Sequence, residues 1–121
     1  MILYRPGKDA AFKIMPAKDP DAVNKPYTIL VQGNLPGDTT SDPATFLAAG
    51  VSITDATVTT DDPLLTVANH TVASGYVVVW LSGGTVDTTA TVTVHIVTDL
   101  DNGIGGFYED DISFKLPIKQ R

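Results

Sequence analysis

The residues best placed to hold a metal ion lie in the stretch Asp-Leu-Asp-Asn-Gly at positions 99–103. Alternating oxygen ligands followed by a glycine open the loop of EF-hand calcium sites, which carries a bidentate glutamate at its twelfth position. Counting from Asp99, that position is Asp110, a carboxylate on a shorter side chain. Asp, Asn and Gly are also what an ordinary hairpin turn prefers. We therefore predict a turn without a metal ion, and calcium is the alternative.

Groups that could transfer protons are scarce. The 121 residues include two histidines, one glutamate (Glu109), thirteen aspartates and no cysteine, so disulfides and thiolate sites are excluded. The sequence contains no G-x-S-x-G elbow, Walker loop, dinucleotide G-x-G-x-x-G or H-E-x-x-H helix. His95 falls on the polar side of a predicted strand, where a solvated or cross-strand role is expected. We predict that the protein is not an enzyme and uses no cofactor.

The charges are divided along the chain. No lysine or arginine lies between Tyr27 and Phe114, an interval that holds eleven of the fourteen acidic residues, while both ends are basic. Nucleic-acid binding depends on clustered Lys and Arg, so an acidic body argues against it. No run of 18 apolar residues occurs, and no signal peptide is recognised at the start, so neither a membrane span nor a cleaved leader is expected.

The elements that would position these groups are predicted to be strands. Branched residues dominate after residue 50, and Val, Ile and Thr suit a pleated surface. The segment 33–43 is rich in turn formers, and 44–50 could form one helical turn or a bridging segment. The predicted strands cover residues 27–32, 51–60, 64–72, 76–81, 89–96 and 108–119.

Three of these strands carry specific expectations. A change of apolar parity within 51–60 predicts a bulge near Asp55. The segment 76–81 is apolar on both parities, which predicts a central strand covered on both faces with Trp80 in the core. Strict alternation in 89–96, followed by an Asn-Gly turn and a returning strand, predicts a hairpin whose last strand, through Pro117, lies at a sheet edge.

The fold class that follows is all-β. Short strands and turn signals at this spacing are typical of an immunoglobulin-like β-sandwich, here of about seven antiparallel strands. Four of the eight prolines and five of the eight basic residues fall within residues 1–26. We therefore predict an extended N-terminal arm over residues 1–17, with one short edge strand around Ala11 to Met15, and a sandwich domain over residues 18–121.

Several stretches together resemble a family of small phage virion proteins, the fiber-tail adaptor proteins. They are "KDPDAV" with "PYTI", then "LPGDT", "GVSITDATVT", "VVVWLSGGT" and "DISFKLPIKQR", and more loosely "MILYRPGKDAAFK". The similarity covers roughly residues 18–121. The chain departs from the family in having no tryptophan after the Tyr-Thr-Ile strand and in an elongated loop at 99–106.

The resemblance implies a structural component of a phage virion, assembled in the host cytoplasm, that connects a fiber to the tail or neck. Its partners would be other virion proteins, and it would be present as a homo-oligomer or in symmetric copies. Opposite charges steer docking and set its register, so the basic ends form the predicted partner interface: Tyr4, Arg5, Lys8, Lys13, Lys115, Lys119 and Arg121. Capsid decoration, another virion accessory role and carbohydrate binding are the alternatives.

Overall fold

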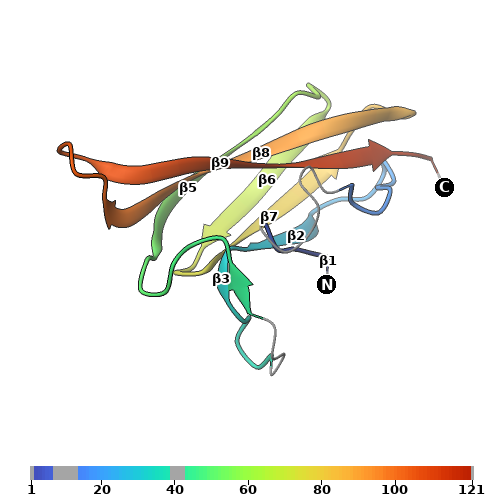
Figure 1. The fold of residues 1–121 in the computed structure, drawn as a ribbon. Helices are drawn as coiled ribbons and strands as arrows, with labels where there is room; N and C mark the ends of the chain where they lie inside the picture. The colour runs from blue at the N-terminus through green and yellow to red at the C-terminus, as the bar shows by residue number, and fades with distance from the viewer. Residues whose placement is uncertain (1, 7–13, 39–42, 121) are drawn as a thin grey trace.

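The computed structural model describes residues 2–6, 14–38 and 43–120. These residues form strands and connecting loops, with no helix among them (Figure 1). Consequently, the described residues include no helix that could cross a membrane. The strands are β1 (Ile2–Tyr4), β2 (Lys25–Leu30), β3 (Gln32–Gly33), β4 (Ala44–Thr45), β5 (Ile53–Thr60), β6 (Leu65–Val72), β7 (Tyr76–Gly83), β8 (Thr88–Asp101) and β9 (Phe107–Ile118).

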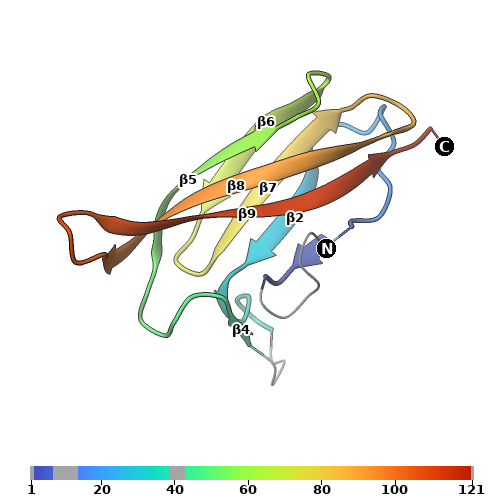
Figure 2. The same ribbon diagram turned by 45° about the horizontal axis from the view of Figure 1, so that its top comes forward.

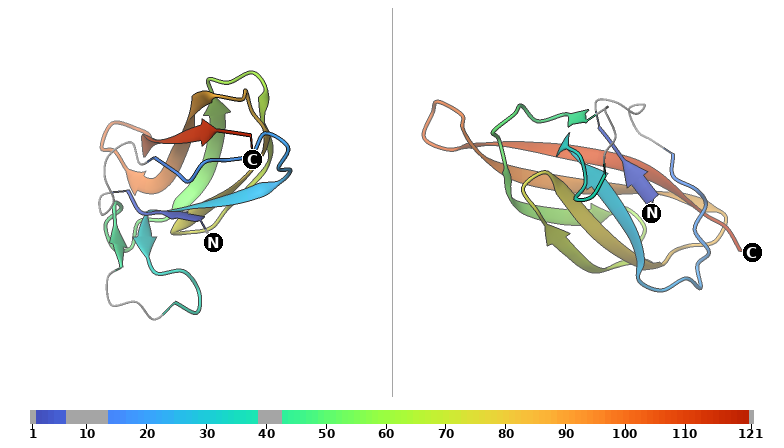
Figure 3. Two further views of the ribbon diagram at one scale, coloured as in Figure 1. Left: turned by 90° about the vertical axis from the view of Figure 1, so that its right-hand side faces the viewer. Right: turned by 90° about the horizontal axis from the view of Figure 1, so that it is seen from below.

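Two sheets make up the body of the molecule. One has the strand order β1-β2-β7-β6 and the other β5-β8-β9, and the short pair β3-β4 stands apart from both. Figure 2 and Figure 3 show the two larger sheets layered over each other. All neighbouring strands run antiparallel except β1 and β2, which are parallel. The prediction of an all-β sandwich is confirmed.

The hairpin of β8 and β9 follows the predicted alternation. Ala90, Val92, Val94 and Ile96 of β8 are at most 1% exposed, and the intervening side chains face outward. On β9 the inward positions are Ile112, Phe114, Leu116 and Ile118, each at most 4% exposed. Phe114 packs on Tyr27 of the opposite sheet with ring centroids 5.9 Å apart. The period-two pattern therefore specified both strands and their register.

The predicted bulge in β5 is present. The pairing of β5 with β8 shifts register between Ile53 and Asp55, after which Ala56 lies opposite Ile96. The extra residue lets Ile53 and Ala56, which have opposite parity, both be buried at 5% exposure. The carboxylate of Asp55 accepts a hydrogen bond from the next backbone N–H at 2.8 Å, which supports the local bend.

The prediction for β7 was right about its central position and wrong about its outer face. The strand is central, between β2 and β6. Val77, Val79 and Leu81 are fully buried, but the residues between them, including Val78 and Trp80, are only half-buried on the outer face of the sheet. Among the described residues no second layer covers that face, and β-branched and aromatic residues suit such a half-exposed pleated surface as well as a buried one. Trp80 is therefore not a core residue.

The N-terminal segment is joined to both sheets. β1 extends the first sheet beside β2, and Met15 is buried at 2% exposure. Ile14 and Lys18 form parallel bridges with Lys115 and Ile118 along the outer edge of β9. The short edge strand expected around residues 11–15 lies in part outside the described residues, since 11–13 are not among them. The bridge at Ile14 is the part that the structure describes.

The long connection between β2 and β5 leaves the body of the sandwich. It carries the two-residue strands β3 and β4, which pair with each other. Residues 46–50 continue from β4 through bends and a turn. The helical turn considered for residues 44–50 is therefore not formed, and the bridging alternative holds.

Candidate functional site

Four residues of the predicted interface are described by the structure. Tyr4 is 4% exposed on β1, which gives it a place in the core. Arg5 follows it and is half-buried. Lys115 on β9 is half-buried, and its ammonium donates to the hydroxyl of Thr91 at 2.7 Å. Lys119 lies just past β9 and is exposed.

Lys8, Lys13 and Arg121, the other three predicted residues, lie outside the described residues. The structure brings Lys115 and Lys119 to the same end of β9, whereas Tyr4 and Arg5 lie at the β1 side of the other sheet.

Sequence reasoning missed the role of Lys18. Its side chain is fully buried, and the ammonium donates to the carbonyl oxygens of Asp19 (3.0 Å), Ala22 (2.9 Å) and Gly83 (2.6 Å). Burial lowers the pKa of Lys18 from its ordinary value, and the nearby charge of Lys25 adds to this effect. The backbone of Lys18 also bonds to Pro117 and Lys119. Lys18 therefore ties the N-terminal segment to both sheets and is a structural residue.

Asp62 holds two loops together in a similar way. It is 6% exposed, and its carboxylate accepts hydrogen bonds from the N–H of Leu64 and from both the N–H and the hydroxyl of Thr85 at 2.7–2.9 Å. Burial opposes ionisation, but these three donors outweigh it, so the pKa of Asp62 lies below its ordinary value. The Thr85 of the motif Trp-Leu-Ser-Gly-Gly-Thr thus holds a buried carboxylate.

The carboxylates of the acidic turn at 99–103 and of Asp110 are engaged in hydrogen bonds. The carboxylate of Asp99 accepts from the N–H of Ser52, that of Asp101 from Gly103, and that of Asp110 from the phenol of Tyr108. The last bond, with burial, raises the pKa of Tyr108 to about 12. Among the described residues, no three His, Cys, Asp or Glu side chains converge as metal ligands.

His95 has the cross-strand role that its position predicted. Its Nδ1 lies 2.7 Å from a carboxylate oxygen of Asp111, and its Nε2 lies 2.7 Å from one of Glu109. Hydrogen bonds to Glu109 and then Asp111 raise the pKa of His95 above its ordinary value. The imidazole and both carboxylates are largely open to solvent on the outer face of the β8–β9 hairpin. The three residues form a surface ion-pair cluster.

The tip of the β8–β9 hairpin exposes apolar side chains. Leu100, Ile104 and Phe107 are 46%, 89% and 56% exposed, and all three belong to the turn or its flanks. Figure 1 shows the hairpin projecting past the other strands at the end of the molecule opposite the C-terminus. The elongated loop was expected from the sequence, but the exposure of these three residues was not.

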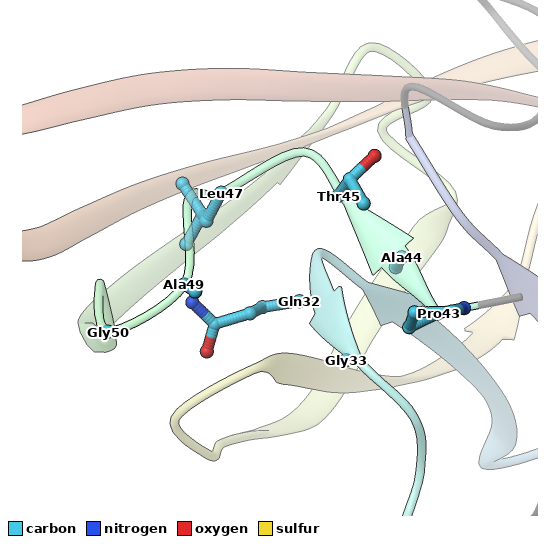
Figure 4. Close-up of a pocket in the computed structure, with 8 residues that line it drawn as sticks. All are labelled: Gln32, Gly33, Pro43, Ala44, Thr45, Leu47, Ala49 and Gly50. Atoms are coloured by element: carbon cyan, nitrogen blue, oxygen red, sulfur yellow. The ribbon is translucent and has the colours of Figure 1, made fainter.

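Two shallow pockets lie elsewhere on the surface. One, of about 350 Å³, is formed by Trp80 on the outer sheet face with Asn24, Ala68 and Asn69. The other, also about 350 Å³, lies between β3–β4 and the chain that leads to β5 (Figure 4). It is lined by Gln32, Gly33, Pro43, Ala44, Thr45, Leu47, Ala49 and Gly50, and none of these eight carries an ionisable side chain. Neither pocket holds a group suited to acid–base chemistry.

The fold and its surfaces define a small all-β protein with exposed apolar and charged side chains and, among the described residues, no converging metal-ligating groups. Residues 37–104 match the family described as podophage GP4 fiber-tail adaptor protein gp77. The match covers more than half of the 121 residues, so the chain belongs to this family. The resemblance noted from the sequence is confirmed, and with it a structural role in a phage virion. Searches of curated proteins and of solved structures gave no significant match.

Proposed function

We propose that this protein connects a fiber to the tail or neck of a phage particle through protein–protein surfaces, in symmetric copies. The observation that carries the proposal is its membership of the fiber-tail adaptor family over residues 37–104. The exposed hairpin tip and the basic end of β9 offer two separate surfaces, as a connecting protein requires. Assembly into the particle would take place in the host cytoplasm.

The proposed architecture is immunoglobulin-like. In constant-type immunoglobulin domains one sheet has the order A-B-E-D and the other C-F-G. Assigning β1, β2, β5, β6, β7, β8 and β9 to strands A to G reproduces both orders. The parallel pairing of β1 with β2 is a departure from that scheme. The assignment supports an adaptor because such sandwiches present loops at two opposite ends.

A binding role, rather than catalysis, agrees with how the polar groups are used. Lys18 and Asp62, the most buried charged side chains among the described residues, are both engaged in bonds that hold loops together. His95 lies in an open cluster on a strand face. None of these groups lines either of the two pockets described above.

The basic residues are proposed to contact an acidic surface of a partner. Lys119 is exposed, and Lys115 and Arg5 are half-buried. Because solvent screens such charges, they would set orientation and association rate more than affinity. Reversing the charge at this position with Lys119→Glu should slow association with the partner and weaken the salt dependence of the association rate, as measured by surface plasmon resonance. An unchanged association rate would contradict this part of the proposal.

The connecting role is tested with particles made by a phage that lacks this gene. Purified fiber is mixed with these particles, with and without the recombinant protein, and fiber in the sedimented particles is quantified. Fiber should sediment only when the protein is present, and imaging should place the protein between fiber and tail. Fiber that attaches without the protein, or protein found only on the capsid shell, would refute the proposal; the latter result would favour capsid decoration.

Carbohydrate binding is the second candidate, and one observation favours it. Trp80 lies half-buried beside two asparagine side chains in a shallow surface pocket. An aromatic ring with neighbouring amides can stack on and hydrogen-bond a sugar. A glycan array in which Trp80→Ala abolishes all signals would support this role, and an array without any signals from the wild type would exclude the tested sugars.

A further inference from the structure

The hairpin tip is the most exposed apolar feature among the described residues. Ile104 is 89% exposed and Phe107 is 56% exposed, and Leu100 lies on the preceding strand at 46%. Large apolar side chains grouped on a projecting element mark interaction sites more often than single scattered ones do. The tip lies beyond the other strands in Figure 1 and in the right-hand view of Figure 3. A neighbouring molecule could therefore enclose it from several sides.

The loop that carries these side chains is internally bonded. The carboxamide oxygen of Asn102 accepts from the N–H groups of Ile104 (2.9 Å) and Gly106 (3.2 Å), and the N–H of Asn102 donates to the carbonyl of Gly106 at 3.0 Å. The carboxylate of Asp101 accepts from the N–H of Gly103 at 2.7 Å. A turn held in this way loses less conformational entropy on binding than a free loop would. The tip is thus preorganised.

The charge around the tip indicates what it would bind. Asp99 and Asp101 precede the turn, and Glu109, Asp110 and Asp111 follow it, while no lysine or arginine occurs in the sequence between Lys25 and Lys115. His95 offsets part of this charge, because it is bonded to Glu109 and Asp111. A partner pocket lined with apolar side chains and rimmed by Lys or Arg would complement both properties. An acidic pocket would be repelled.

A second copy of this chain is a poorer match for the charge of the tip than a basic-rimmed partner. At the opposite end, the loops that include Val23 and Leu64 are also apolar and exposed. Those loops and the neighbouring turn carry the exposed carboxylates of Asp21, Asp61 and Asp87 beside the exposed ammonium of Lys119, so the charges at this end are mixed rather than uniformly basic. With a net charge of −6, two copies also repel each other overall.

We infer that the β8–β9 hairpin tip, residues 99–107, is an anchor that inserts Ile104 and Phe107 into an apolar, basic-rimmed pocket of another virion protein. This inference rests on the proposed connecting role and names the surface that makes one of its two attachments. Leu100 widens the buried area, and the carboxylates of Asp99 and Asp101 face the basic rim.

The test compares a tip variant with a matched control. The tip variant is Ile104→Ser with Phe107→Ser; the control, at the opposite end, is Val23→Ser with Leu64→Ser, which removes two side chains that are 71% and 62% exposed. Both pairs are in loops or at a strand end, so both variants should keep the wild-type circular dichroism and melting temperature. The probes are the purified fiber and particles from the gene-deleted phage, and affinities are measured for each probe separately.

The tip variant should bind one of the two probes about thirtyfold more weakly, the size of a typical hot-spot truncation, and should keep its affinity for the other. The control variant should bind both like the wild type. The wild-type affinity for the affected probe should fall as salt increases. A loss of less than about threefold, or an equal loss in the control, would overturn the inference while leaving the connecting role intact.

Two other results are decisive. If the wild type binds neither probe, the connecting role itself fails and the anchor fails with it. If analytical ultracentrifugation shows that the wild type self-associates and the tip variant does not, the occupant is a second copy and the inference of a basic-rimmed partner is wrong.

Discussion

Replacing Lys18 by methionine tests whether the buried ammonium holds the N-terminal segment against the sandwich. The substitution keeps the length of the side chain and removes the donor shared by three carbonyl oxygens, at 2.6–3.0 Å. Hydrogen bonds from a charged donor contribute about 1.5–3 kcal/mol each. The desolvation of the ammonium offsets several kcal/mol of that sum. We expect a net loss of about 3 kcal/mol in the free energy of unfolding.

The assay is thermal and urea unfolding followed by circular dichroism. For a domain of this size, about 3 kcal/mol corresponds to a fall of about 10 °C in the melting temperature. Lys119→Met is the matched control, because it makes the same change in charge on an exposed side chain nearby, and its effect should stay within about 0.5 kcal/mol. If the free energy of unfolding of Lys18→Met is within about 1 kcal/mol of the wild-type value, the ammonium does not hold these segments together.

Three further substitutions have defined outcomes. Asp62→Asn removes an anionic acceptor from a buried site and should lower the free energy of unfolding in urea by about 2 kcal/mol. In the wild type, the stabilisation from the Asp62 carboxylate should disappear as pH falls through the lowered pKa of this residue. The pKa of His95 is raised in the folded state, so the stabilisation from protonated His95 is complete below pH about 6 and declines as pH rises through the folded-state pKa. The melting temperature of His95→Gln should lack this decline. His70→Gln is the control, and it should retain the decline. Gly84→Ala should cost about 2 kcal/mol, because Gly84 has φ +117° and an added Cβ would lie 2.8 Å from Cδ1 of Ile118; equal stability of this variant would mean that the turn relaxes without strain.

The parts of the fold that the sequence predicted are those governed by local periodicity. Residues 89–96 alternate strictly, and they form the centre of β8 with the predicted faces. The parity change around Asp55 appears as a bulge because only an extra residue lets both apolar sets be buried. In each case one strand contains all of the necessary information.

The parts that were missed depend on contacts between distant segments. Burial of Lys18 requires carbonyls from residues 19, 22 and 83, which no local pattern brings together. Trp80 was assigned to the core because its neighbours are apolar on both parities, but whether a second layer covers the outer face depends on the whole topology. The exposed tip residues Ile104 and Phe107 could have been found from the sequence, because apolar residues in a Gly-rich turn are themselves unusual.

Residues 14–18, which lie along the end of β9, affect how neighbouring copies of the protein can contact each other. A bare strand at the border of a sheet is a template for pairing with another chain, and symmetric particles hold many copies close together. The bridges at Ile14 and Lys18 occupy that border of β9 with the protein's own backbone. Neighbouring copies would thus be kept from pairing their strands with this end of β9, so that contacts there are decided by side chains.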